Sequence, residues 1–202
     1  MSNRTSETVS PTATRRGLLL ALAAVPAMWA TGCAVTGGQS SGSPADKRRQ
    51  IDSGVDATLS RLYSTVKGSQ ELANKSRGML VFPQVLAAGL VVGGEYGEGA
   101  LRVGGRNTAY YRTASGSFGF QAGAQSKAFV LFFMTQEALD RFRNSSGWTA
   151  GVDGSVALLK IGANGELDTN NFRQDVAAIA MTNAGLMYNL TIEGTKITRM
   201  DV

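Results

Sequence analysis

The stretch that decides the fold is Ala128-Phe-Val-Leu-Phe-Phe-Met134, seven consecutive apolar residues in the second half of the chain. A strand with one face in solvent alternates apolar and polar side chains, whereas a strand buried on both faces is apolar throughout. This segment therefore predicts a buried central strand.

Further strand-like segments lie on both sides of this central strand. They are predicted at residues 78–82, ending at Pro83, and at 87–96, 100–103, 108–112, 117–125, 148–161, 176–182, 186–193 and 196–199. Asn164-Gly165 and Glu193-Gly194 are typical of tight turns. Many short strands, with turn signals about every 8–12 residues, indicate an antiparallel sheet closed into a barrel or sandwich.

An amphipathic helix is predicted before the sheet, from Lys47 onward. Its apolar residues recur at spacings of three or four: Ile51, Val55, Leu59, Leu62 and Val66. Asp46 is the expected N-cap and Gly68 the expected stop. Shorter helices are predicted at residues 69–76 and 137–142, the latter capped by Thr135. We expect the helices to pack on one side of the sheet, which makes the class α+β.

The segment Gly93-Gly-Glu-Tyr-Gly-Glu-Gly99 is dense in glycine and could be taken for a phosphate loop. It lacks the Lys-Ser/Thr pair of that motif, and no helix pattern follows it. We expect its glycines to permit bulges and strong coiling instead. Alternation places Glu95 and Glu98 on opposite faces of a straight strand, which argues against an acid–base pair.

The N-terminal segment is typical of an export and lipid-attachment signal. Arg15-Arg16 precede an apolar run, Gly17 to Ala30, and Ala30-Thr-Gly-Cys33 follows. The last four residues resemble a bacterial lipobox, in which the cysteine is acylated and cleavage falls before it. The apolar run is shorter than the roughly 20 residues that span a bilayer. Two acyl chains on Cys33 would anchor the protein stably.

The signal leaves the export route open between general secretion and the twin-arginine pathway. It divides the chain into a signal peptide at 1–32, a lipidated cysteine with a flexible tether at 33–46, and a domain at 47–202. An aspartate after the cysteine often signals inner-membrane retention, and Ala34 stands there instead. We therefore expect an anchor in the outer membrane, facing the periplasm or the exterior.

Composition excludes several classes of function. The chain has no histidine, and Cys33 is its only cysteine. Ser-His-Asp and Cys-His catalysis and His- or Cys-ligated metal sites are thereby ruled out. Loss of residues 1–32 would lower the net charge from +5 to +3, and no dense basic stripe suggests a nucleic-acid partner. We expect no enzyme activity, no catalytic residues, no metal and no cofactor.

Four segments resemble the SYLF domain family: Arg77-Gly-Met-Leu-Val-Phe-Pro83, residues 88–101, residues 115–126 and residues 185–196. The resemblance spans nearly all of Lys47 to Asp201. It implies a non-catalytic lipid-binding module, since eukaryotic members bind phosphoinositides, with an N-terminal basic helix implicated, and some bind actin. This chain differs in resembling a bacterial lipoprotein and in lacking SH3 or FYVE neighbours.

A cluster of basic residues is the candidate site for anionic lipid headgroups. Its members are Lys47, Arg48, Arg49, Arg61, Lys67, Lys75 and Arg77. Each cation near an anionic surface contributes about 1 kcal/mol. The alternative is an ordinary solvated helix face. For the whole protein, a carrier of an apolar molecule within the barrel and a purely structural envelope component remain the other functions. Protein partners are not predicted.

Overall fold

The computed structural model describes residues 43–89, 92–118, 125–159, 161, 165–167, 174–182, 185–186 and 192–202. They belong to one compact unit, Ser41–Val202. Cys33, the signal segment and most of the predicted tether lie outside the described residues. The end of that tether, Pro44 to Asp46, forms the first turn of a helix instead.

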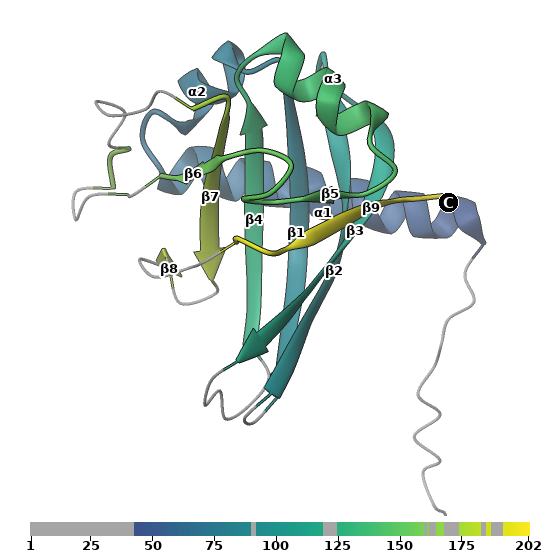
Figure 1. Ribbon diagram of the computed structural model, residues 1–202. Coiled ribbons are helices and arrows are strands. Elements are labelled where there is room, and N and C mark those ends of the chain that lie inside the picture. Colours follow the sequence, from purple (N-terminus) through teal and green to yellow (C-terminus); the bar gives the residue numbers. More distant parts are fainter. Residues whose placement is uncertain are drawn as a thin grey trace, which may run out of the picture. The chain divides into compact units, whose positions relative to one another are not determined.

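The unit combines three described helices with one large sheet (Figure 1). The helices are α1 (Pro44–Thr65), α2 (Ser69–Lys75) and α3 (Gln136–Asn144). The strands are β1 (Gly78–Gly89), β2 (Val92–Val103), β3 (Arg106–Phe118), β4 (Gln125–Phe133), β5 (Trp148–Thr149), β6 (Val156–Leu158), β7 (Val176–Thr182), β8 (Gly185–Leu186) and β9 (Lys196–Met200).

The sheet has the strand order β5-β9-β3-β2-β1-β4-β7-β6, with β8 paired to β7. All of these pairings are antiparallel except β6 with β7. The sheet curls into a half-barrel, and α1 crosses behind its long strands (Figure 1). The α+β class and the barrel-like antiparallel sheet with an N-terminal helix are thus confirmed.

The predicted central strand is confirmed as β4, which lies between β1 and β7. Its alternate side chains enter two different cores. Phe129, Leu131 and Phe133 join one hydrophobic cluster. Val130 and Phe132 join another on the opposite face, with Ile51, Val55, Leu59 and Leu62 of α1. A strand that is apolar on both faces is therefore buried between two cores.

The prediction that all helices lie on one side is wrong. Whereas α1 packs against β1 and β2 in the second cluster, α3 places Ala138, Leu139 and Phe142 in the first. We call the two faces of the sheet the α1 face and the α3 face. On the α3 face Phe142 contacts Phe133 and Tyr111, with ring centroids 4.9 and 4.8 Å apart.

Several predicted strand boundaries are also wrong. Pro83 does not end the first strand, because it sits in a β-bulge where the β1 register shifts against both neighbours. Residues 87–96 are not one strand: β1 ends at Gly89 and β2 begins at Val92, so the two form a hairpin. The described residues of the segment 148–161 form only two short strands, β5 and β6. The alternating run at 117–125 falls largely outside the described residues.

Two glycines of the predicted glycine-dense strand lie opposite this bulge. A Cβ on Gly99 would overlap the carbonyl oxygen of Val81 and lie 2.8 Å from Cδ1 of Phe82. A Cβ on Gly97 would lie 2.6 Å from Cγ2 of Val85. The bulge therefore lies opposite these glycines, with its one extra residue in β1, and not in the glycine-dense segment of β2 where we expected it.

Capping explains where α1 begins. Ser43, not Asp46, is the N-cap, and Asp46 completes a capping box by accepting hydrogen bonds from Ser43. Three hydrogen bonds, from the Ser43 hydroxyl, the Arg49 side chain and the Ser43 backbone, lower the pKa of Asp46. Helix α1 ends before Val66, and Gly68, in the left-handed conformation, precedes α2. The predicted second helix and the Thr135 cap of α3 are confirmed.

Candidate functional site

The α1 face of the sheet is only partly covered by α1. Strands β1, β2 and β3 continue past the point where the helix crosses them (Figure 1). On this exposed continuation Leu86 and Tyr96 are each 49% accessible. They are two of the three large hydrophobic side chains that are exposed among the described residues. Burial of such groups is favourable, so a paired exposure of this kind marks a surface available for contact.

Strand register places these side chains in one row. Leu86 pairs with Tyr96, and Tyr96 pairs with Ala114 of β3, so all three point from the same face. The row continues to Ser126 of β4 on one side and to Lys196 of β9 on the other. We call Leu86, Tyr96 and Ala114 the apolar row.

Charged groups border the apolar row on the side toward α1. Glu98 pairs in register with Arg112, whose side chain is exposed. Nζ of Lys47 lies 2.7 Å from Oε1 of Glu98, and the Tyr96 hydroxyl donates to the same oxygen at 2.7 Å. Partial burial and this hydrogen bond raise the pKa of Tyr96 to about 12, and nearby Arg112 opposes the shift. Tyr96 is therefore a neutral phenol at physiological pH.

A groove separates α1 from this part of the sheet. One section, of about 550 Å³, lies between Gln50, Gly54 and Ala57 of the helix and Leu86 and Tyr96 of the sheet. An adjoining section of about 350 Å³ ends at Arg61. Small helix residues make this space: a Cβ on Gly54 would already lie 3.1 Å from Pro83. An apolar row, a groove and bordering cations form a surface with both apolar and cationic character.

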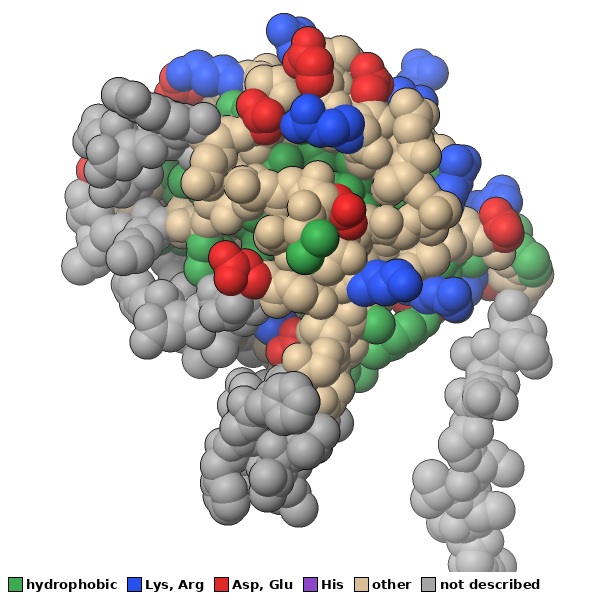
Figure 2. All heavy atoms as spheres, viewed as in Figure 1, with side chains coloured by type: hydrophobic (Ala, Val, Ile, Leu, Met, Phe, Trp, Pro, Cys, Tyr) green, Lys and Arg blue, Asp and Glu red, His purple; other side chains and the backbone are tan. Residues whose placement is uncertain are grey.

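The seven basic residues predicted to form one cluster are distributed over different surfaces. Four of them form ion pairs: Lys47 with Glu98, Arg49 with Asp46, Lys67 with Glu166 at an N–O distance of 3.8 Å, and Lys75 with Glu71 at 2.7 Å. The Arg48 side chain donates a hydrogen bond to the carbonyl of Val202. Arg61 is exposed beside the groove, and Arg77 is exposed after α2. In Figure 2, basic side chains gather toward the side that carries the C-terminus, with acidic side chains among them.

Helical spacing explains which of these residues come together. Lys47, Gly54 and Arg61 are seven residues apart, or nearly two turns, so they lie on the flank of α1 that borders the groove. Arg49 is offset by two residues from Lys47 and lies on the other flank, where Asp56 and Tyr63 follow at the same spacing. Lys67, Lys75 and Arg77 follow the helix and do not border the groove.

Sequence reasoning missed Leu86, Tyr96, Arg112 and Lys196 as surface residues. Alternation within residues 93–99 could have placed Tyr96 on the face opposite Glu95. The neighbours across the strands depend on register, however, and the bulge at Pro83 shifts that register. No pattern in a single segment reports such a shift.

Glu95 and Glu98 lie on opposite faces of the sheet, as predicted. Glu95 is on the α3 face, where its carboxylate lies 2.7 Å from Nζ of Lys127 and accepts from the Ser115 hydroxyl at 3.2 Å. The two side chains are 15% and 9% exposed. This pair links β2 to β4 across β1 and leaves no free carboxylate for catalysis with Glu98.

None of the described helices is both long and apolar enough to cross a membrane. In the same part of the chain, no three histidine, cysteine, aspartate or glutamate side chains gather as metal ligands would.

Comparison with protein families supplies the context for this surface. Residues 114–201 match the Ysc84 family, described as Las17-binding protein actin regulator. The match begins within β3 and extends through β9. Comparison with curated proteins gave no match. Residues 114–201 are therefore similar to the SYLF (Ysc84) family, a family of generally non-catalytic, lipid-binding domains.

Proposed function

We propose that this protein is an envelope lipoprotein, anchored through acylated Cys33 in the outer membrane, whose domain binds anionic phospholipid. The observation that carries the lipid-binding part is the apolar row beside Lys47, Arg61, Arg112 and Lys196. Tyr96 offers an apolar ring and a polar tip, the combination that tyrosine uses at membrane interfaces. The surrounding cations complement anionic headgroups.

The charge balance of this surface favours an anionic partner. Lys47 is compensated by Glu98, at 2.7 Å. The Arg61 and Arg112 side chains are exposed, and neither guanidinium group has a hydrogen bond or ion pair to another described residue. Two guanidinium groups without a partner among the described residues therefore lie near the apolar row, Arg61 on α1 and Arg112 on β3. A bilayer that receives Leu86 and Tyr96 at headgroup depth would bring lipid phosphates within their reach.

The position of α1 also suits an orientation in which Leu86 and Tyr96 face the bilayer. The contact of Lys47 with Glu98 places the first turn of α1 at the margin of the apolar row. The chain upstream of Ser43 enters the domain at that turn. A tether from Cys33 to Ser43, ten residues long, has an r.m.s. reach of roughly 17 Å. An anchored domain would thus be held with this margin close to the bilayer.

Vesicle binding tests the proposal. The described buried residues of both hydrophobic cores lie within 51–197, so the unit 41–202 contains them and can be prepared alone. We expect it to co-sediment with vesicles containing phosphatidylglycerol, and to do so less as salt rises. Arg61→Ala with Arg112→Ala should weaken binding about tenfold or more, at about 1 kcal/mol for each cation. Arg143→Ala with Arg199→Ala, which removes two exposed arginines on α3 and β9, is the charge-matched control.

A site-specific label tests the orientation. The unit 41–202 contains no cysteine, so Leu86→Cys introduces a single thiol for an environment-sensitive fluorophore. We expect its emission to shift to the blue on anionic vesicles, whereas a label at Val152→Cys, which is 79% exposed on the α3 side, should not respond. Vesicle binding without a shift at position 86 would reject the apolar row as the contact, and absence of binding would reject lipid binding altogether.

The alternative functions have less support among the described residues. The α3 face of the half-barrel, where a carried molecule would sit, is filled by the aromatic side chains of the first core. Phe82 and Phe129, for example, stack with ring centroids 4.7 Å apart.

A further inference from the structure

A second pocket lies on the other flank of α1, away from the apolar row. It has a volume of about 600 Å³ and lies between Asp56, Ser60 and Tyr63 of α1, the residues Ala73, Asn74 and 76–79, and the β2–β3 turn. Arg77 and Arg102 both line it. We infer that this pocket binds a phosphate monoester, with Arg77 and Arg102 as the groups that hold the phosphate.

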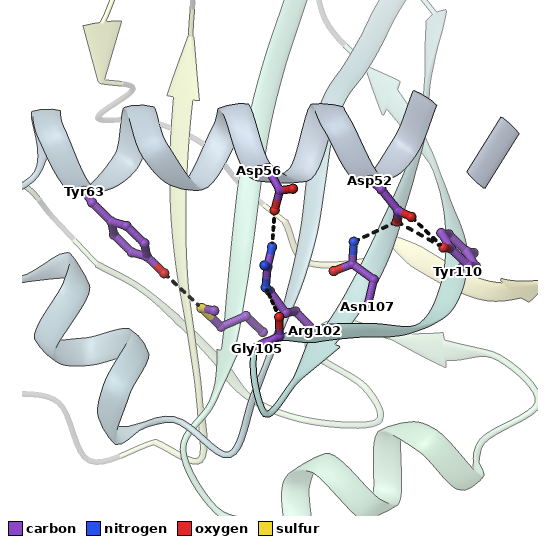
Figure 3. Close-up of polar contacts among 8 residues, drawn as sticks. Asp52, Asp56, Tyr63, Arg102, Gly105, Asn107 and Tyr110 are labelled. Carbon is purple, nitrogen blue, oxygen red and sulfur yellow. Dashed lines mark hydrogen bonds and ion pairs between the residues drawn. The ribbon is translucent and has the colours of Figure 1, made fainter. Parts of the chain in front are cut away.

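The first argument is the state of the two guanidinium groups. Arg77 uses its backbone N–H to bond Phe133, but its exposed side chain has no partner among the described residues. Arg102 is only 23% exposed, and Asp56 and the carbonyl of Gly105 hold it in place (Figure 3). A guanidinium carries five N–H donors, so these two acceptors leave Arg102 with donors to offer.

The second argument is the surplus of hydrogen-bond donors around the two arginines. Asn74 and Ser60 line the pocket without a side-chain partner among the described residues. The Tyr63 hydroxyl contacts only Sδ of Met79, at 3.8 Å, a weak acceptor (Figure 3). Asp56 is the only carboxylate in the lining, and Arg102 already occupies it. Two guanidinium groups with further donors beside them, and a single lining carboxylate that already pairs with Arg102, favour an anion with several oxygens.

The Tyr63 hydroxyl remains a hydrogen-bond donor at physiological pH. Burial raises the pKa of Tyr63, and the positive charge of Arg102 opposes the shift only in part. The phenol therefore keeps its proton at physiological pH.

The other residues that line the pocket indicate what kind of group the phosphate is attached to. Leu59, Ala73 and Met79 provide an apolar floor. Gly104 and Gly105 form the β2–β3 turn, with φ of 57° and 78°, and a Cβ at either would meet nothing within 4 Å. The turn therefore places no side chain in this part of the pocket lining. A phosphate attached to a compact organic group fits such a pocket, and both a soluble phosphate ester and the headgroup of phosphatidic acid have that chemistry.

Calorimetric titration of the unit 41–202 tests the inference, with glycerol 3-phosphate as the soluble probe and short-chain phosphatidic acid, kept below its micelle concentration, as the lipid probe. We expect saturable binding of at least one of them. Equal affinities would show that the phosphate alone is recognised, and tighter binding of the lipid would show that the headgroup and its glycerol ester are recognised together.

Three variants make the test specific. Arg77→Gln should weaken binding about tenfold or more, because a charge-assisted pair is lost. Asp56→Asn should strengthen binding, because it frees Arg102 for the phosphate, a gain that general damage to the fold would not produce. Lys75→Gln, two residues from Arg77 and outside the pocket lining, is the matched control and should leave affinity unchanged. Melting curves of each variant report whether it folds.

Absence of saturable binding to both probes at millimolar concentration would overturn the inference. So would an equal heat signal with acetate, or equal effects of Arg77→Gln and Lys75→Gln. None of these measurements uses vesicles, so they leave membrane binding through the apolar row to be judged by its own experiment.

Discussion

At the scale of single residues, the bulge in β1 leaves no room for a side chain at two positions of the neighbouring strand β2. Gly97 and Gly99 are required because the backbone of β1 approaches them too closely for any Cβ. The glycine-dense segment predicted a close approach of this kind, but it did not indicate which strand would contain the bulge. That depends on Pro83, which lacks an N–H and so tolerates a place where the ladder is interrupted.

We predict that Gly99→Ala lowers the free energy of unfolding by about 3 kcal/mol, because the new methyl group overlaps the carbonyl of Val81 and the ring of Phe82. Gly116→Ala, in the next strand, meets nothing within 4 Å and should change it by less than about 0.5 kcal/mol. Urea unfolding of both variants measures the difference. Equal stabilities would contradict the close approach.

The pH dependence of Tyr96 is a second prediction at this scale. Its folded pKa of about 12 lies above the ordinary value of 10.0, so folding favours the neutral phenol. The resulting stabilisation is complete below pH 10 and is lost as the pH rises through 12. In a titration followed by phenolate absorbance, Tyr96→Phe should remove a late step near pH 12. Loss of a step near pH 10 instead would show that Glu98 does not hold the hydroxyl.

At the scale of elements, α1 was the part of the fold most fully predicted. Its apolar spacing identified the residues that enter the second core, because a helix repeats every few residues. The helix start was misplaced by a few residues, since both Ser43 and Asp46 are good caps and act together here. Pairings such as β1 with β4 and β3 with β9 could not be predicted in this way, because they join residues far apart in the sequence.

We predict that Ser43→Ala lowers the free energy of unfolding by about 1 kcal/mol through loss of the N-cap. Ser64→Ala, whose hydroxyl bonds only to the carbonyl of Arg61 in the same helix, should have little effect. The pKa of Asp46 is lowered from 3.8, so its share of the stability is present above pH 3.8 and lost as the pH falls below it. The difference between Ser43→Ala and the parent should therefore shrink in acid; a constant difference would argue against the capping box.

The ion pair between β2 and β4 gives a further prediction. Glu95→Gln should cost about 2–3 kcal/mol, because Lys127 is only 8% exposed and would keep its charge without a partner. Adding Lys127→Met to Glu95→Gln should recover part of this loss. A double-mutant cycle by urea unfolding gives the coupling energy. Strictly additive effects would mean that the two side chains do not interact.

At the scale of the whole molecule, the α+β class followed from the sequence, but the candidate site did not. The seven predicted basic residues lie near one another in sequence, yet α1 carries Lys47 and Arg61 on one flank and Arg49 on the other. The apolar row instead unites β1, β2 and β3, which are distant along the chain from Lys196. Proximity in the sequence is a poor guide to a surface that is built across strands.

The proposed anchor yields the prediction that belongs to the whole chain. Cys33→Ser should prevent acylation, so the protein should leave the membrane fraction when the cells are washed in high salt, which screens the remaining charge attraction. The unaltered chain should stay, because its acyl chains are insensitive to salt. Mass spectrometry of the N-terminal peptide identifies the modification, and an unmodified Cys33 in the membrane-bound protein would refute the anchor.

The place of Lys127 directly before Ala128-Phe-Val-Leu-Phe-Phe-Met134 has a consequence for the chain before it folds. Seven apolar residues without proline are an aggregation hazard whenever they are exposed as an unpaired strand. A charge at the end of such a run acts as a gatekeeper against stacking with other chains. Glu95 then neutralises that charge once β2 and β4 take their places. The charge of Lys127 thus opposes aggregation of the unfolded polypeptide, and the ion pair with Glu95 neutralises it in the native protein.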